Sequence, residues 1–336
     1  MSTRTMKAIL AANPGGAFVS REIQVPEPGP GQVRVKVHAC GVCAGEYIVR
    51  NGMLGAQLPR VPGHEIAGKV DAVGAGVTAW TPGDRVGVGW HGGSCFTCEY
   101  CRKGDFANCA NRKITAVSYD GGYAEYMVAP EDALAGIPDS MSLEEAGPMM
   151  CAGITSFNAL RHSGARPGET VVVHGIGGLG HLALQFADKM GFRTIAVNRG
   201  RAKEKLARQL GADDYIDSEG ESAGQAVARM GGAAVVFSTV GSSAAHADLL
   251  QGLRPNGRLV IVAVDHQPLQ VSPGLLVSGR RSVAGWASGT AKDSEETMAF
   301  AALKKIKAIV EPRALEDAED AFQNMKRARF RTVLTP

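Results

Sequence analysis

Four cysteines lie close together along the chain, in an arrangement typical of a metal site: Cys95, Cys98, Cys101 and Cys109. Thiolates at such short spacings can surround one cation, and a ligand set of sulfur alone suits tetrahedral zinc. Because such a site has no open coordination position, we predict a structural rather than a catalytic zinc. The chemistry of the protein must then depend on other residues.

Two alternatives for these cysteines are disulfide pairing and an iron–sulfur cluster in an electron carrier. Disulfides are expected mainly in secreted proteins, and the first residues, Met1–Leu10, contain no hydrophobic signal segment. The spacing before Cys109 does not match the usual ferredoxin pattern. We therefore expect zinc, and a cytoplasmic location in which thiols stay reduced.

A glycine-rich turn follows the apolar segment 170–174 and precedes a helical pattern at 179–190. It contains Gly-x-Gly-x-x-Gly as Gly175, Gly177 and Gly180, with Gly178 and Leu179 between the last two. Between a strand and a helix, such glycines allow a tight turn, close approach of a pyrophosphate and close helix packing. The motif therefore predicts a dinucleotide cofactor.

The end of the next predicted strand indicates which dinucleotide binds. An acidic residue there would bind the ribose 2′-hydroxyl of NAD, whereas a cation would bind the 2′-phosphate of NADP. The chain has Asn198 and Arg199 at this point and no carboxylate, and an arginine can bind phosphate oxygens with two N–H groups. We predict NADP(H), with NAD(H) as the alternative if the cations are only solvated.

Three further candidate metal ligands are scattered along the chain: Cys43, His64 and Cys151. Their spacing does not connect them, and each alone is most simply an ordinary buried residue. Together, however, two cysteines and one histidine make the ligand set of a catalytic zinc with one open position.

The length and composition of the chain suit a globular protein of two domains. It has 336 residues, 45% of them hydrophobic, and a formal net charge of +3. This small charge without a basic block argues against nucleic acid as a partner, and no apolar stretch is long enough to cross a membrane.

Two kinds of local pattern divide the chain. Residues 1–153 contain short strands broken by glycine and proline, such as 33–37 with its alternating apolar residues. Strands and helices then alternate, with strand patterns at 170–174, 193–198, 233–237 and 258–264 and helical patterns at 179–190 and 202–210. This alternation predicts an α/β cofactor domain with a doubly wound parallel sheet at 154–290. Residues 291–336 end in a strand pattern at 330–334 and are expected to rejoin the mostly β first domain.

Several motifs, in this order, resemble those of the zinc-dependent medium-chain alcohol dehydrogenases over essentially the whole chain. Gly63-His64-Glu65-Ile66-Ala67-Gly68 and Gly83-Asp84-Arg85-Val86 are similar to that family's signature, and the cysteines at 95–109 to its structural-zinc lobe. The segment Cys151-Ala152-Gly153 is similar to its third-ligand segment. The resemblance implies a GroES-like catalytic domain with a zinc lobe at 91–112, a Rossmann cofactor domain, two zinc ions per chain, and a homodimer or homotetramer.

The resemblance also assigns residues to roles. Cys43, His64 and Cys151 would bind the catalytic zinc, with Glu65 as an occasional ligand. The implied cofactor contacts are Thr155 at the nicotinamide, Lys203 at the adenosine ribose, Arg331 at the pyrophosphate, and Val264. Trp90 would line a pocket for a small apolar or aromatic alcohol or aldehyde, ordinary core packing being its alternative. The implied reaction is zinc-assisted hydride transfer, expected to run as aldehyde reduction.

The chain departs from this family just after Cys43. The family usually continues with His or Arg, then Ser or Thr, then Asp, whereas this chain has Ala44, Gly45 and Glu46. Gly45, expected beside the substrate, has no hydroxyl with which to begin a proton relay from a bound alcohol. Glu46 keeps a carboxylate that can orient a ligand such as His64.

Three interpretations of Gly45 remain open. Water replaces the hydroxyl in an ordinary carbonyl reductase, or hydride adds to a conjugated C=C bond or an iminium carbon that needs no oxygen protonation. In the third, the fold is kept for non-catalytic binding.

Overall fold

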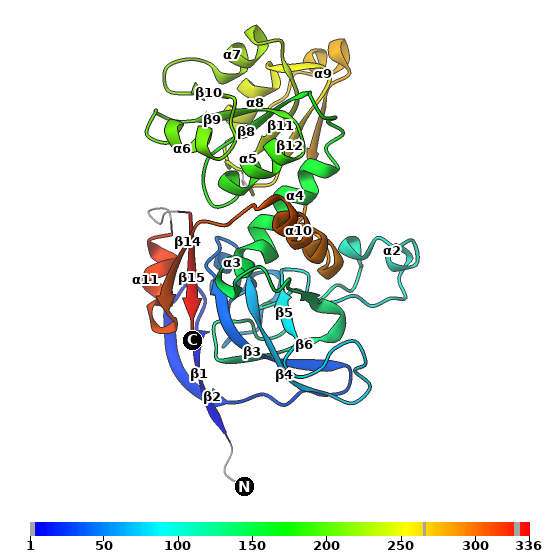
Figure 1. Cartoon of the computed structure of the whole chain (residues 1–336), viewed down its shortest axis with the longest axis vertical. Helices are drawn as coiled ribbons and strands as arrows, with labels where there is room; N and C mark the ends of the chain where they lie inside the picture. The colour runs from blue at the N-terminus through cyan, green and yellow to red at the C-terminus, as the bar shows by residue number, and fades with distance from the viewer. Residues whose placement is uncertain (1–3, 265–266, 326–329) are drawn as a thin grey trace. The chain divides into compact units, whose positions relative to one another are not determined.

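The computed structural model describes residues 4–264, 267–325 and 330–336. The chain forms two compact units, one made of Met1–Ile154 with Ser288–Pro336 and the other of Thr155–Ala287. Strands dominate the first unit, and strands and helices alternate along the second (Figure 1).

The first unit is built on a largely antiparallel sheet. Its strand order is β14–β15–β3–β4–β5–β7, with β6 also paired to β3, and only β14 and β15 run parallel to one another. The strands are β3 (Gln32–Gly41), β4 (Ile66–Val73), β5 (Arg85–Val88), β6 (Tyr126–Pro130), β7 (Leu134–Gly136), β14 (Val310–Ala314) and β15 (Arg331–Thr335). A separate antiparallel hairpin joins β1 (Thr5–Ala11) to β2 (Phe18–Gln24).

Strand β3 carries the alternation that buries one face of this sheet. Val33, Val35 and Val37 are buried in the core, whereas Lys36 between them is exposed. At the far end of the strand, Cys40 pairs with Ile66 at the start of β4. This pairing brings the loop after β3 next to the loop before β4.

Short helices complete the first unit. They are α1 (Glu46–Arg50), α2 (Glu99–Arg102), α3 (Leu143–Pro148), α10 (Ala291–Lys304) and α11 (Ala318–Gln323). A π-helical turn, η4 (Met149–Gly153), follows α3, and α4 (Ile154–Arg161) begins directly after it. The remaining single turns are η1 (Met53–Gly55), η2 (Phe106–Asn108), η3 (Glu131–Ala133) and η5 (Leu315–Asp317).

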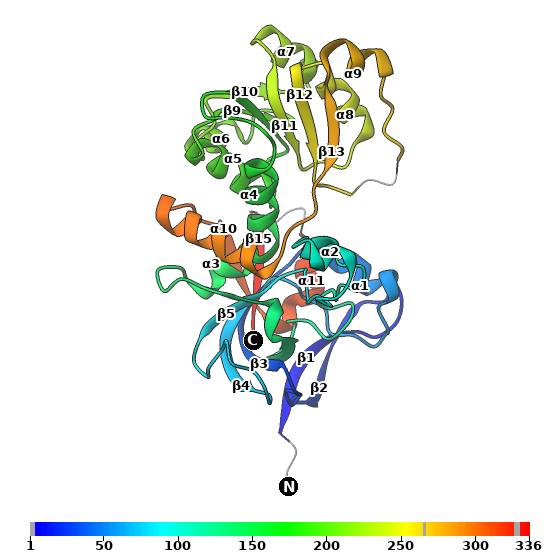
Figure 2. The ribbon, with the colours of Figure 1, turned by 90° about the vertical axis from the view of Figure 1, so that its right-hand side faces the viewer.

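The second unit is a doubly wound sheet of six parallel strands in the order β10–β9–β8–β11–β12–β13. This is the Rossmann strand order 3-2-1-4-5-6. Figure 2 shows α5 and α6 on one side of the sheet and α8 and α9 on the other. The elements are β8 (Thr170–His174), α5 (Gly180–Lys189), β9 (Arg193–Asn198), α6 (Glu204–Gln209), β10 (Asp214–Asp217), α7 (Ala223–Arg229), β11 (Ala233–Ser238), α8 (Ser243–Leu250), β12 (Leu253–Ile261), α9 (Pro273–Gly279) and β13 (Ser282–Gly285).

The predicted α/β architecture is confirmed, with small corrections to the elements. The last strand pattern of the chain is β15, and its Leu334 pairs with Cys40 of β3, so the tail does rejoin the first sheet. The strand expected at 258–264 is β12, Leu253–Ile261, which begins earlier because Leu253 already pairs with Ala233 of β11 and which ends at Ile261. In the described part of the chain, every helix is too short or too polar to span a membrane.

Candidate metal and cofactor sites

The four cysteines of the predicted lobe converge in the structure. One ligand atom from each lies within 4.8 Å of the others: Cys95, Cys98, Cys101 and Cys109. The Sγ atoms of Cys95 and Cys109 are 3.5 Å apart, whereas a disulfide needs about 2.05 Å. All seven cysteines of the chain are free thiols, which removes the disulfide alternative for this structure.

Local hydrogen bonds favour the thiolate at Cys95 and Cys98, whereas burial raises the pKa of Cys101 to about 12. The backbone N–H of Cys95 donates to the Sγ of Cys109 at 3.4 Å, and the hydroxyl of Thr97 donates to the Sγ of Cys95 at 3.6 Å. The Thr97 hydroxyl is the largest cause that lowers the pKa of Cys95, to about 5. The convergence of four thiols within this distance fits a tetrahedral zinc.

A second cluster joins the three scattered ligands and one carboxylate: Cys43, His64, Glu65 and Cys151. Their ligand atoms also lie within 4.8 Å of one another, although Cys43 and Cys151 are 108 positions apart. Cys43 follows β3, His64 and Glu65 precede β4, and Cys151 lies on the π-helical turn η4. The pairing of β3 with β4 therefore brings three of the four residues together.

Glu46 holds the His64 ring from the side away from the cluster. Its Oε1 lies 2.6 Å from His64 Nδ1, and its Oε2 accepts the backbone N–H of Gly63 at 2.9 Å. Burial lowers the pKa of His64, but the charges of Glu46 and Cys43 outweigh it and raise this pKa to about 10. A carboxylate on Nδ1 leaves Nε2 as the ring nitrogen for a metal.

Glu65 is fixed at one oxygen and open at the other. Arg331 of β15, buried like Glu65, donates from Nη2 to Glu65 Oε1. Glu65 Oε2 is buried and has no hydrogen-bond partner among the described residues. A buried carboxylate oxygen without a partner is costly, and a cation in the cluster would satisfy it.

The two thiols of this cluster share one hydrogen bond. The Sγ atoms of Cys43 and Cys151 are 3.9 Å apart. This bond is the largest cause that lowers the pKa of Cys43 well below its usual range, and the same bond raises the pKa of Cys151. Two thiols, an imidazole and a carboxylate oxygen fit zinc, and the three stronger ligands leave one position for a substrate.

Trp90 and Gly45 both lie against the His64 ring. The rings of His64 and Trp90 meet edge to face, with their centroids 4.9 Å apart. Trp90 thus lies beside one candidate metal ligand, and its role as a wall of the substrate pocket stays a prediction.

The glycine turn of the second unit leaves room for a cofactor at one position. Gly175 has φ +87°, and a Cβ there would lie 2.5 Å from Val240 Cγ2. A Cβ on Gly180 would lie 1.8 Å from the carbonyl oxygen of Gly175, so helix α5 packs directly on the turn. At Gly177, by contrast, a Cβ would meet nothing within 4 Å. This is the pattern expected where a pyrophosphate approaches the middle glycine.

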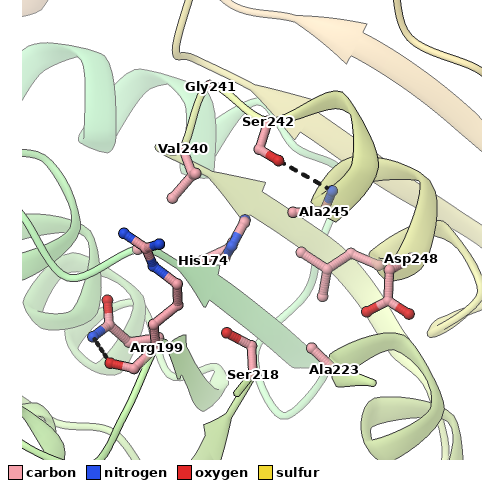
Figure 3. Close-up of a pocket in the computed structure, with 12 residues that line it drawn as sticks. His174, Arg199, Ser218, Ala223, Val240, Gly241, Ser242, Ala245 and Asp248 are labelled. Carbon is pink, nitrogen blue, oxygen red and sulfur yellow. Dashed lines mark hydrogen bonds between the residues drawn. The ribbon is translucent and has the colours of Figure 1, made fainter. Parts of the chain in front are cut away.

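A pocket of about 500 Å³ opens beside this turn. Its lining includes Gly175, Asn198, Arg199, Val240 and Ser242. Figure 3 shows the Arg199 side chain reaching into the pocket from the end of β9. Among the described residues, the Arg199 guanidinium has no hydrogen bond or ion pair, so it is free to bind an anion.

The other predicted cofactor residues are placed as follows. Lys203 donates from Nζ to the carbonyl oxygen of Ile176 at 2.5 Å, which ties it to the glycine turn. Thr155 is buried at the start of α4, and Val264 is 84% exposed after β12. Arg331 forms an ion pair with Glu65 of the ligand cluster in the first unit, and its predicted contact with the pyrophosphate stays a prediction.

Sequence reasoning missed a buried polar chain beneath the pocket. His174 Nδ1 lies 2.9 Å from the Ser238 hydroxyl, which lies 2.9 Å from His246 Nε2. All three side chains are buried. Their adjacency arises from the parallel pairing of His174 on β8 with Ser238 on β11, for which the sequence holds no local signal.

Two buried histidines predict that the protein loses stability in mild acid. Burial, assisted by His246, lowers the pKa of His174 to about 4, and burial lowers the pKa of His181 to about 4. In the unfolded chain the pKa of both histidines would be about 6.5. Between about pH 4 and pH 6.5 the unfolded state therefore binds more protons than the folded state. Stability is therefore complete above about pH 6.5 and falls as the pH drops toward 4, by on the order of 2 kcal/mol per histidine at pH 5.

Urea unfolding of the full chain at pH 8 and pH 5 measures this effect. His181→Gln should reduce the loss of stability between pH 8 and pH 5 by on the order of 2 kcal/mol, because one buried histidine with a lowered pKa is gone. Equal pH dependence in wild type and variant would show that His181 is already protonated, or solvated, in the folded state.

Comparison with known proteins identifies the family of the chain. The family model "Alcohol dehydrogenase GroES-like domain" matches residues 29–139, and "Zinc-binding dehydrogenase" matches residues 178–303. The alcohol dehydrogenase patD of Penicillium expansum is 42% identical over 333 residues, covering 98% of each chain. A solved cinnamyl alcohol dehydrogenase of Sorghum bicolor superposes with a TM-score of 0.89 at 30% identity, covering 99% of this chain and 98% of that one. The protein CAD of Helicobacter pylori, solved with NADP(H), gives 0.87 at 26% identity, covering 99% and 98%.

A GroES-like β domain joined to a Rossmann sheet, with two clusters of metal ligands in the first unit, defines a class of two-domain dehydrogenases. The chain belongs to the zinc-dependent medium-chain alcohol dehydrogenase family, and it is an oxidoreductase of that family.

Proposed function

We propose that the protein transfers a hydride between NADP(H) and a small apolar or aromatic alcohol or aldehyde, acting as an aldehyde reductase with two zinc ions per chain. The observation that carries this proposal is the largely buried cluster of two thiols, one imidazole and one unpartnered carboxylate oxygen. Zinc bound by Cys43, His64 and Cys151 would supply Lewis acidity, which polarises a carbonyl oxygen or stabilises an alkoxide.

The residues around the cluster would orient the ligands and the substrate. Glu46 fixes the tautomer and direction of the His64 ring, and Arg331 holds one oxygen of Glu65 beside the ligands. The Trp90 ring offers an apolar surface next to His64, which favours substrates with an aliphatic or aromatic group on the carbonyl carbon.

The preference for NADP(H) rests on Arg199. Its guanidinium lies in the pocket beside the glycine turn, at the end of β9 where the ribose 2′ position is bound in this fold. A 2′-phosphate would give this cation a charge-assisted partner.

A second candidate function follows from Gly45. The residue that follows Ala44 has no hydroxyl, so the chain has no side chain there to begin proton transfer from a bound alcohol. Reduction of a conjugated C=C bond or an iminium carbon would not need that proton step, which makes such substrates the alternative.

One experiment tests both candidates. Zinc content is measured first, and aldehydes, alcohols, enals and cyclic imines are then assayed with NADPH and NADH. Two zinc ions per chain, with aldehyde reduction faster than all other reactions, support the proposal. Efficient reduction of enal C=C bonds without alcohol oxidation favours the second candidate, and a visible absorption spectrum with about one zinc or less would contradict both.

A further inference from the structure

The backbone conformation of Gly45 does not require a glycine. Its φ and ψ are −58° and −23°, in the right-handed helical region that any residue adopts. It caps the N-terminus of α1 without any side-chain hydrogen bond. The requirement for glycine must therefore come from the space around it.

The His64 ring occupies the space that a side chain at position 45 would need. A Cβ on Gly45 would lie 2.8 Å from His64 Cε1, 3.4 Å from His64 Nε2 and 3.6 Å from Trp90 Cζ3. The first distance is shorter than Cβ contacts in proteins allow, so the ring or the α1 backbone would have to move. The atoms that collide belong to the metal-binding edge of the imidazole.

The His64 ring is held where it is from two sides. Glu46 contacts Nδ1 at 2.6 Å and is itself fixed by the backbone N–H of Gly63 at 2.9 Å. Trp90 packs edge to face against the ring, and both His64 and Glu46 are buried. Because the ring is anchored at Nδ1, it has no easy path away from a new Cβ at Cε1.

We propose that Gly45 is a positioning residue for the metal ligand His64, and that Gly45 and Glu46 depend on one another. The long carboxylate arm of Glu46 holds the imidazole against position 45, and only glycine leaves room for it there. The inference rests on the proposed zinc site at Cys43, His64 and Cys151. It also changes the meaning of the missing hydroxyl, because a serine at position 45 would disturb His64 before it could act as a proton relay.

Zinc affinity, measured without reference to turnover, tests this proposal. Wild type, Gly45→Ala, Gly45→Ser, Glu46→Asp and Gly45→Ser/Glu46→Asp are equilibrated with graded chelator, and zinc per chain is measured. Gly45→Ser should bind the zinc ion at Cys43, His64 and Cys151 roughly 10–100-fold more weakly, because a change beside a metal ligand commonly lowers affinity by this factor. The cysteine lobe should keep its zinc. The double variant should bind this zinc ion about tenfold more tightly than Gly45→Ser, because the shorter aspartate lets the His64 ring move away from position 45.

A matched control is Gly136→Ala in β7, where the nearest atoms to a new Cβ lie at 3.5 and 3.9 Å. It should bind both zinc ions as wild type does. Substitution of zinc by Co²⁺ adds a signature of geometry, because the visible bands should shift in Gly45→Ser and return in the double variant. A merely destabilised fold would not show this recovery.

The outcomes distinguish a failure of the proposed zinc site from a failure of the proposed role of Gly45. A wild type with zinc in the cysteine lobe alone would overturn the proposed zinc site itself. A wild type with two zinc ions and an equally tight Gly45→Ser variant would overturn the role of Gly45. Additive losses in the double variant would overturn its dependence on Glu46. If Gly45→Ser does not fold, Gly45→Ala carries the same comparison, since its Cβ alone makes the 2.8 Å contact.

Discussion

Replacing Cys151 by alanine is expected to lower kcat/KM by about 10³-fold and to release one zinc ion per chain. The loss of one of two thiolates weakens both the metal affinity and the electrostatic support of the reacting oxygen, and about 4 kcal/mol of such support corresponds to about 10³ in rate. Steady-state kinetics with NADPH and the best aldehyde, together with zinc content after gel filtration, measure the two effects.

Cys40→Ala provides the matched control for this prediction. Cys40 is a fully buried free thiol on β3, three positions before Cys43, but it lies outside the ligand cluster. Its removal should lower stability modestly and leave both zinc ions in place. If Cys151→Ala kept two zinc ions and its activity, the cluster at Cys43, His64 and Cys151 would not be the catalytic centre.

The parts of these sites that lie close together in sequence were accessible to prediction. The cysteine lobe and the glycine turn each depend on a short run whose spacing reflects one local geometry, so Cys95 to Cys109 and Gly175 to Gly180 could be read directly. The alternation of strands and helices likewise predicted the Rossmann sheet, because each strand and its following helix leave their own periodicity.

The cluster of Cys43, His64, Glu65 and Cys151 could not be derived in the same way. Cys43 and Cys151 are 108 positions apart, and only the meeting of β3, β4 and the turn η4 joins them. The resemblance to a known family supplied that connection before the structure did. The same limit explains why the contact of Arg331 with Glu65 was not foreseen, since it depends on β15 pairing with β3.

Gly45 shows a further limit of sequence reasoning. The sequence shows only that Gly45 lacks the hydroxyl group that the family usually has there. The structure shows that the imidazole edge of His64 lies 2.8 Å from the position that a Cβ would take. The absence of a side chain that a family pattern leads one to expect can therefore be a packing requirement.

Reversing the charge of Arg199 is expected to reverse the choice of cofactor. A charge-assisted hydrogen bond contributes about 1.5–3 kcal/mol, so Arg199→Gln should weaken NADPH binding about 10–100-fold and leave NADH binding nearly unchanged. Arg199→Asp should go further, because a carboxylate repels the 2′-phosphate and accepts a hydrogen bond from the 2′-hydroxyl of NADH. The ratio of kcat/KM for the two cofactors, with Kd from fluorescence titration, measures the change.

Arg201→Gln is the control, since it removes the same charge from the same loop. Arg201 is paired with Glu204 at 2.7 Å and does not line the pocket. Its replacement should therefore change the affinities for NADPH and NADH only slightly and by the same factor. Raising the salt concentration should weaken NADPH binding more than NADH binding in wild type, and this difference should vanish in Arg199→Gln. A wild type that prefers NADH, or an Arg199→Gln variant with the wild-type ratio, would assign the pocket to NAD(H) and reduce Arg199 to a solvated cation at the end of β9.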